Sequence, residues 1–152
     1  MIKQILVPTD GSEHGALGVQ YGIGLAKQHD ASLVGLHVVD IRLLEGPFLR
    51  DISASLGTAP HGNYQNKISL LLEENGQPAL ADFAARCEKS GIPFQASQLT
   101  GSVAHTIVEQ SELADLVVMG RGGKHQEWLG SLIGSTTETV VRHSKCPVLV
   151  TG

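Results

Sequence analysis

Aromatic residues and basic charge are both scarce in this chain. Its 152 residues include three Phe, two Tyr and one Trp, and the formal net charge is −4 at neutral pH. So few aromatic side chains argue against a platform on which nucleic-acid bases stack. The acidic balance leaves no basic surface of the kind that binds DNA or RNA. We therefore expect a core of aliphatic side chains and no nucleic-acid partner.

Long apolar runs and a cysteine framework are also missing. No apolar run approaches the ~18 residues that a membrane-spanning helix needs, and residues 1–11 lack the apolar segment and cleavage site of a signal peptide. Cys87 and Cys146 match no metal-binding spacing and are interpreted as reduced thiols. The length fits one domain. We expect a cytoplasmic protein without membrane insertion, with a single domain spanning 1–152.

What the chain does contain is an alternation of short apolar runs and segments of helical period. Strands are predicted at 5–7, 31–41, 93–101, 115–120 and 147–152, with helices at 10–30, 64–90, 102–113 and 135–143. Pro78 should kink or divide the second helix. The glycines at 15, 18, 22 and 24 should let the first helix pack closely on a sheet. This alternation predicts an α/β protein with a mostly parallel sheet and helices on both faces.

The familiar catalytic and metal-binding patterns fail. Gly123-Lys124 is followed by His125 rather than Ser or Thr, so the P-loop pattern is absent, and no dinucleotide fingerprint follows the first strand. The seven histidines show no ligand spacing, and no nucleophile can be paired with a base. The sequence therefore predicts no catalytic residue and no metal site.

Glycines and polar residues do gather where three of the predicted strands end. Open α/β sheets bind ligands at the carboxyl ends of their strands. Gly120, Gly122 and Gly123 would allow close approach of a phosphate chain, Arg121 and Lys124 would offset its charge, and the helix beginning at Ser135 and Thr136 offers free N–H groups. Micromolar binding needs about −8 kcal/mol, which favours a polyphosphate. The same glycines would also suit an ordinary strand–helix connection.

Asp10 follows the first strand and also has two interpretations. Its carboxylate would be repelled by phosphate, so in a nucleotide site it suits hydrogen bonds to the sugar or the base. Alternatively, Asp10 or Ser12 caps the first helix. The residues alone leave both open.

Three segments together carry a family resemblance. "KQILVPTDGSEHGALGV", "LVGLHVVD" and "ADLVVMGRGG…GSTTETVVRHSKCPVLV" resemble the universal stress protein family over nearly the whole chain. The resemblance implies an open five-stranded parallel sheet of order 3-2-1-4-5, which is Rossmann-like and of the adenine nucleotide alpha hydrolase type. It also implies a homodimer that pairs through the last strand, residues 147–151 starting at Pro147.

ATP-binding members of that family resemble G-x2-G-x9-G-[ST]. Here Gly120 and Gly123 match the first part, and Gly134 and Ser135 match the last, with ten residues between the two parts instead of nine. The resemblance further implies that Asp10 and Val38 meet ribose and adenine. It implies that the remaining residues of the site are Pro8, Thr9, Met119, Arg121, Lys124 and Thr136.

Three hypotheses follow. The first is a regulatory module of the stress response that binds ATP, with Mg2+ carried by the nucleotide phosphates, at most weak hydrolysis, and an unidentified regulatory protein partner. The second is a family member without nucleotide, acting as a dimerisation or protein-interaction domain. The third is a phosphoacceptor receiver or a flavodoxin-type domain. Both would normally have a helix after the fifth strand, and a receiver needs paired acidic residues near its first strand, where this chain has Asp10 alone.

Overall fold

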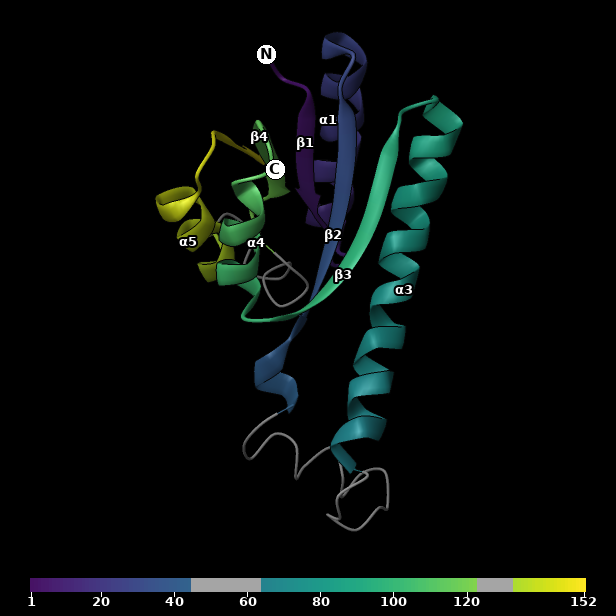
Figure 1. Cartoon of the computed structure of the whole chain (residues 1–152), viewed down its shortest axis with the longest axis vertical. Coiled ribbons are helices and arrows are strands. Elements are labelled where there is room, and N and C mark those ends of the chain that lie inside the picture. Colours follow the sequence, from purple (N-terminus) through teal and green to yellow (C-terminus); the bar gives the residue numbers. More distant parts are fainter. Residues whose placement is uncertain (45–63, 123–132) are drawn as a thin grey trace.

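The computed structural model describes residues 1–44, 64–122 and 133–152 (Figure 1). The elements follow one another in this order: β1 (Gln4–Pro8), α1 (Glu13–His29), β2 (Ser32–Asp40), a short 3-10 helix (Ile41–Leu44), α3 (Tyr64–Ser90), β3 (Phe94–Gly101), α4 (Val103–Ser111), β4 (Leu116–Gly120), α5 (Ser135–His143) and β5 (Val148–Thr151). The predicted alternation is confirmed, and α5 has the predicted bounds.

The strands form one parallel sheet of order β3-β2-β1-β4-β5, as predicted. The chain runs outward from β1 through β2 to β3, and then returns to the other side of β1 for β4 and β5 (Figure 1). The connections that leave β1 and β4 therefore diverge to opposite faces. This reversal is the switch point of the sheet, at the carboxyl ends of β1 and β4, where open α/β sheets have their ligand-binding crevice.

Helices cover both faces of the sheet. Helices α1 and α3 pack on one face, while α4 and α5 pack on the other (Figure 1). Because successive residues of a strand point to opposite faces, Ile5 and Val7 of β1 contribute to the core under α1 and α3. Leu6 contributes to the core under α4 and α5. A strand that is buried on both faces needs the continuous apolar run that predicted it.

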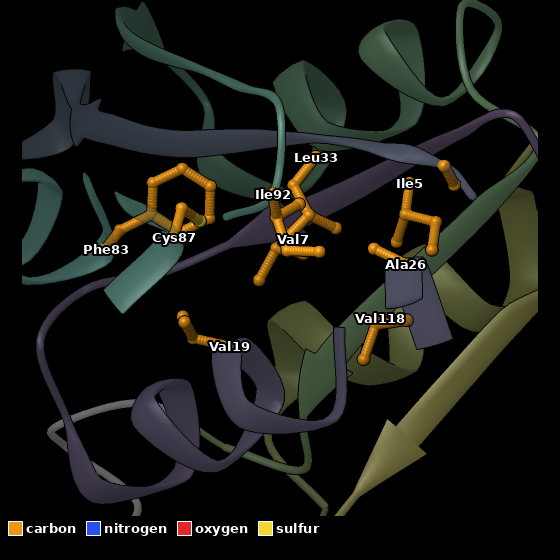
Figure 2. Close-up of a cluster of buried hydrophobic side chains, with 10 residues drawn as sticks. Ile5, Val7, Val19, Ala26, Leu33, Phe83, Cys87, Ile92 and Val118 are labelled. Atoms are coloured by element: carbon orange, nitrogen blue, oxygen red, sulfur yellow. The ribbon is translucent and has the colours of Figure 1, made fainter. Parts of the chain in front are cut away.

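The buried core under α1 and α3 is mostly aliphatic and contains the aromatic side chain of Phe83 (Figure 2). Phe83 of α3 is fully buried, and its ring meets that of Phe94 edge to face with centroids 5.9 Å apart. A Cβ atom on Gly35 of β2 would lie 2.5 Å from the Phe83 ring, so the glycine makes room for it. Complete burial of such a side chain contributes roughly 1.5–3 kcal/mol.

Three of the four glycines in α1 serve close packing, as predicted. A Cβ atom on Gly22 would lie 2.9 Å from Val7, and one on Gly18 would lie 3.3 Å from the backbone nitrogen of Gly120. Gly15 packs against the side chains of Thr9 and Asp10. Gly24 is the exception, because it is exposed and nothing lies within 4 Å of it.

Helix α3 differs from the prediction. Pro78 lies inside the helix, which continues without a break from Tyr64 to Ser90. Proline removes one hydrogen bond and costs about 3 kcal/mol. The residues that follow it, Leu80, Phe83 and Cys87, are buried against the sheet and offset that cost. The expected division of the helix at Pro78 is therefore wrong.

Among the described residues, no helix is both long and apolar enough to cross a membrane.

Candidate functional site

The turn after β1 is held by neighbouring backbone. Thr9 is buried; its N–H donates to the Leu36 carbonyl at 2.8 Å, and its own carbonyl accepts from Nδ1 of His37 at 3.0 Å. Pro8, the last residue of β1, lies opposite Leu36 in the sheet register. Thr9 is therefore fixed to β2 although it lies one residue beyond the strand.

The start of α1 is capped by its own residues. Ser12 is the N-cap, and its hydroxyl oxygen accepts from the Gly15 N–H at 3.0 Å. Asp10 is not the cap. Its Oδ1 accepts at 2.9 Å from the N–H of Ser12, the residue before the first helical residue. Gly11 between them has φ +80°, a left-handed conformation that glycine adopts without strain. Of the two candidates for the cap, Asp10 and Ser12, the structure therefore selects Ser12.

Strands β2 and β4 each contribute an apolar side chain near their carboxyl ends. Val38 and Met119 belong to the same buried cluster, under α4 and α5. Their exposed fractions are 9% and 5%. Asp40, at the end of β2, pairs with the guanidinium of Arg42, with 2.6 Å between Oδ2 and the nearest nitrogen. This ion pair raises the pKa of Arg42.

The two parts of the glycine pattern contact each other directly. The Gly134 N–H donates to the Arg121 carbonyl at 2.8 Å, and the buried hydroxyl of Thr137 donates to the Gly120 carbonyl at 2.9 Å. Arg121 is also tied to β5, because its N–H donates to the Thr151 carbonyl at 3.0 Å. Gly120 and Arg121 of the first part therefore lie beside the start of the second part, whereas Gly123, from which the longer spacing is counted, lies outside the described residues.

The start of α5 carries no side-chain cap. Its N-cap is Gly134, with φ −66° and ψ 155°, and no side chain of the described residues caps it. Ser135 and Thr136 follow as the first helical residues, the former exposed and the latter half-buried. The first N–H groups of a helix have no partner within the helix and carry its positive dipole end. This start therefore offers donors to an anion.

Helix α1 lies against the end of β4, which brings the two halves of the site together. A Cβ atom on Gly120 would overlap the carbonyl oxygen of His14 and lie 2.6 Å from its carbonyl carbon. Only glycine allows this approach, so Gly120 has a packing role beside any role toward a ligand.

Two side-chain nitrogens at this crevice are buried without a hydrogen-bond partner among the described residues. They are Nδ1 of His14 and Nε of Arg121. Buried polar atoms are normally paired. Each of these nitrogens therefore needs a partner outside the described residues.

Sequence reasoning did not assign His14 or His37 to the site, although the position of His37 in a strand indicates a hydrogen-bonded structural histidine, as the structure shows. Nothing in their spacing distinguished them from the other histidines, and the only available signal was position: His14 lies two residues after the cap of α1, and His37 lies one before Val38. Gly123 and Lys124, both predicted for the site, lie outside the described residues.

No competing chemistry emerges from the described part of the chain. Within it, no group of His, Cys, Asp and Glu could hold a metal ion. Burial raises the pKa of the Cys87 thiol to about 11 and also raises the pKa of Cys146. Both cysteines are free, as predicted, and neither thiol is an activated nucleophile.

The model of the universal stress protein family matches residues 1–152. The chain belongs to this family. Universal stress protein MJ0531 of Methanocaldococcus jannaschii is 36% identical over 99% of the chain and 82% of that relative. The structure of MJ0577 from the same organism covers 99% of the chain and 96% of that protein, with 25% identity and a TM-score of 0.78. A universal stress protein of Arabidopsis thaliana, solved with AMP bound, matches with a TM-score of 0.62, 18% identity and coverage of 97% and 90%.

Proposed function

We propose that this universal stress protein is a cytoplasmic regulatory module that binds ATP at the carboxyl ends of β1, β2 and β4. The observation that carries the proposal is the junction of Gly134 and Arg121, which holds the uncapped start of α5 beside the end of β4. Gly120 and Arg121 of the glycine pattern thus lie beside its last part, Gly134 and Ser135.

The adenosine half of the ligand is assigned to β1 and β2. Asp10 accepts hydrogen bonds from the ribose, and Val38 packs on the adenine. Pro8, Thr9 and Met119 complete this half. Val38 and Met119 are buried and apolar, which suits contact with the base, while Thr9 is buried and polar and Asp10 is half-buried. The Arabidopsis relative of the same fold was solved with AMP, an adenine nucleotide.

The phosphate half is assigned to β4 and α5. Micromolar affinity corresponds to about −8 kcal/mol, and each hydrogen bond to a charged group contributes about 1.5–3 kcal/mol. Several donors are therefore needed, and a triphosphate can reach more of them than a single phosphate. The assigned residues are Gly120, Arg121, Gly123, Lys124, Gly134, Ser135 and Thr136. Mg2+ is assigned to the nucleotide phosphates rather than to protein ligands.

We also propose a homodimer that pairs through residues 147–151. β5 forms an edge of the sheet and its Leu149 is 38% exposed, and Val141 of α5 is 52% exposed. An edge strand with apolar side chains is a ready template for pairing with another chain. These exposed residues equally favour the second candidate, a dimerisation or protein-interaction domain that binds no nucleotide.

A thermal titration separates the two candidates. ATP with Mg2+ at a hundred times Kd should stabilise the fold by about 2.7 kcal/mol, which raises Tm by roughly 5–10 °C. No shift at millimolar ATP would contradict the nucleotide site and leave the interaction domain. Asp10→Ala should lower the affinities for AMP, ADP and ATP by the same factor. A loss confined to ATP would overturn the assignment of Asp10 to the adenosine half.

A further inference from the structure

His37 connects the sheet to the turn that carries Asp10. Its Nδ1 lies 3.0 Å from the Thr9 carbonyl oxygen. A carbonyl can only accept, so Nδ1 must carry the proton and donate. The Thr9 N–H donates in the opposite direction, to the Leu36 carbonyl at 2.8 Å. Thr9 is thus held at both its nitrogen and its carbonyl by two consecutive residues of β2.

This tie acts where the sheet itself ends. The register between β1 and β2 stops at the pair of Pro8 and Leu36. Pro8 has no N–H to donate. Thr9 is the first residue beyond the ladder. Without the imidazole, only its own N–H would hold it to β2. Asp10 follows directly, so the orientation of the Thr9 carbonyl sets the direction in which Asp10 leaves the strand.

The ring of His37 is fixed from the other side by α3. A Cβ atom on Gly76 would overlap Cδ2 of the ring, and would lie 2.8 Å from Nε2 and 2.5 Å from Oε1 of Gln98. Gln98 is the register partner of His37 on β3. Glycine is a poor residue for a helix interior, and its position here is explained by the space that the ring occupies. The helix and the two strands thus hold the imidazole in one orientation.

We propose that His37 is a positioning residue for the adenosine half of the site, acting through Thr9 on Asp10, with Gly76 as the helix position that keeps the ring in place. The proposal rests on the proposed function, because Asp10 matters only if it meets the ligand. His37 itself does not contact the nucleotide. The contacts of the phosphate half, which come from β4 and α5, are independent of it.

Two amide variants distinguish the donor from the bulk of the ring. In His37→Asn the amide nitrogen stands near the place of Nδ1 and can donate to the Thr9 carbonyl. In His37→Gln it stands near the place of Nε2 and cannot. His37→Gln should lower the affinities for AMP and ATP equally, by about 2- to 10-fold, the change that corresponds to one neutral hydrogen bond. His37→Asn should stay within about 2-fold of the wild type, and inorganic triphosphate should bind all three proteins alike.

Gly76→Ala tests the same tie without altering His37. Alanine improves the helix propensity of α3, but its Cβ atom displaces the ring, so nucleoside affinity should fall while triphosphate binding is unchanged. Gly24→Ala, a helix glycine with no atom within 4 Å, is the matched control and should change neither affinity. Equal losses in His37→Asn and His37→Gln, or no loss in His37→Gln, would overturn the proposal.

Amide hydrogen exchange in the nucleotide-free protein separates this inference from the proposed function. His37→Gln should speed exchange at the amides of Thr9 and Ser12, which donate to Leu36 and Asp10, and His37→Asn should not. A wild type that binds neither AMP, ATP nor triphosphate overturns the proposed function. The exchange rates then decide the His37 contact by themselves: unchanged rates in His37→Gln show that the tie does not hold the turn.

Discussion

Helices α1 and α5 begin at the same crevice, after the neighbouring strands β1 and β4, yet their starts are completed differently. At α1, Ser12 accepts from the Gly15 N–H and Asp10 accepts from the Ser12 N–H. At α5, the cap position is Gly134, which has no side chain to accept a hydrogen bond. The first helix therefore has a side-chain cap for its Gly15 N–H, whereas the cap residue of the second provides none.

This difference assigns the two starts to different tasks. An N-cap side chain stabilises a helix by about 1 kcal/mol relative to Ala. The chain uses that stabilisation where α1 packs on β4, and omits it where α5 meets Gly120 and Arg121. A bound phosphate would provide the missing acceptors and the missing stabilisation together. Four substitutions test this difference between the two helix starts.

Gly120→Ala should have the largest effect, because it disturbs both helix starts at once. The new Cβ atom would overlap the carbonyl oxygen of His14 in α1. It would also move the carbonyl that Thr137 of α5 binds. Overpacking of this kind costs about 1–3 kcal/mol. We expect a lower free energy of unfolding in urea and loss of ATP binding; unchanged affinity would show that the close approach is irrelevant to the site.

Ser135→Pro should weaken ATP binding without unfolding the protein. Proline is well suited to the first helical position, and ψ 155° at Gly134 is the extended conformation that must precede it. The substitution removes one N–H that we assign to phosphate. Loss of a hydrogen bond to a charged group, about 1.5–3 kcal/mol, corresponds to roughly 10- to 100-fold in Kd by calorimetry.

Two controls accompany that substitution. Ser135→Ala keeps the N–H and removes only the hydroxyl, so it should lose less affinity. Glu13→Pro makes the same backbone change at the first position of α1, where Ser12 has ψ 166°. It should leave the Kd for ATP unchanged. Equal losses at the two helix starts would remove the distinction between them.

Ser12→Ala should affect stability rather than binding. The side chain is buried, and its hydroxyl accepts from the Gly15 N–H at 3.0 Å. Removing an N-cap costs about 1 kcal/mol, measured as a shift of the urea midpoint. The Kd for ATP should stay within about 2-fold of the wild type, and a tenfold loss would mean that the start of α1 also holds the ligand.

Gly24→Ala should have the smallest effect, and a favourable one. This glycine lies in α1 with no atom within 4 Å, unlike Gly18 and Gly22. Alanine should stabilise the helix by up to about 1 kcal/mol, seen as a higher Tm, with no change in ATP affinity. A lower Tm would show that the exposed side of α1 has a contact that the substitution disturbs.

Much of the fold could be predicted from the sequence because its signals are local. Apolar runs such as 5–7 are typical of strands buried on both faces, and their alternation with helical segments indicates a parallel sheet. The division of α3 predicted at Pro78 does not occur, because the burial of Phe83 and Cys87 outweighs the local cost of the proline. That burial depends on contacts with residues distant in the sequence. Local rules cannot weigh those contacts.

The site was predictable only in its outline. Parallel strands end at one edge, so Thr9, Asp10 and Gly120 had to lie near one another. The hydrogen bond of His37 to Thr9 depends on sheet register and on the space left by Gly76, neither of which a sequence pattern reveals. The contact between Gly134 and Arg121 likewise joins residues that have twelve others between them in the chain, and spacing alone did not decide whether they meet.

A nuclear magnetic resonance titration of the labelled protein with adenosine and then with ATP and Mg2+ tests the contrast most directly. Adenosine should shift the backbone amides of Thr9, Asp10 and Val38 only. ATP should shift these and, in addition, the amides of Gly134, Ser135 and Thr136, while the Gly15 amide, already bonded to Ser12, stays in place. Shifts at Gly15 without shifts at Ser135 and Thr136, or no shifts with ATP at all, would contradict the assignment of phosphate to the start of α5.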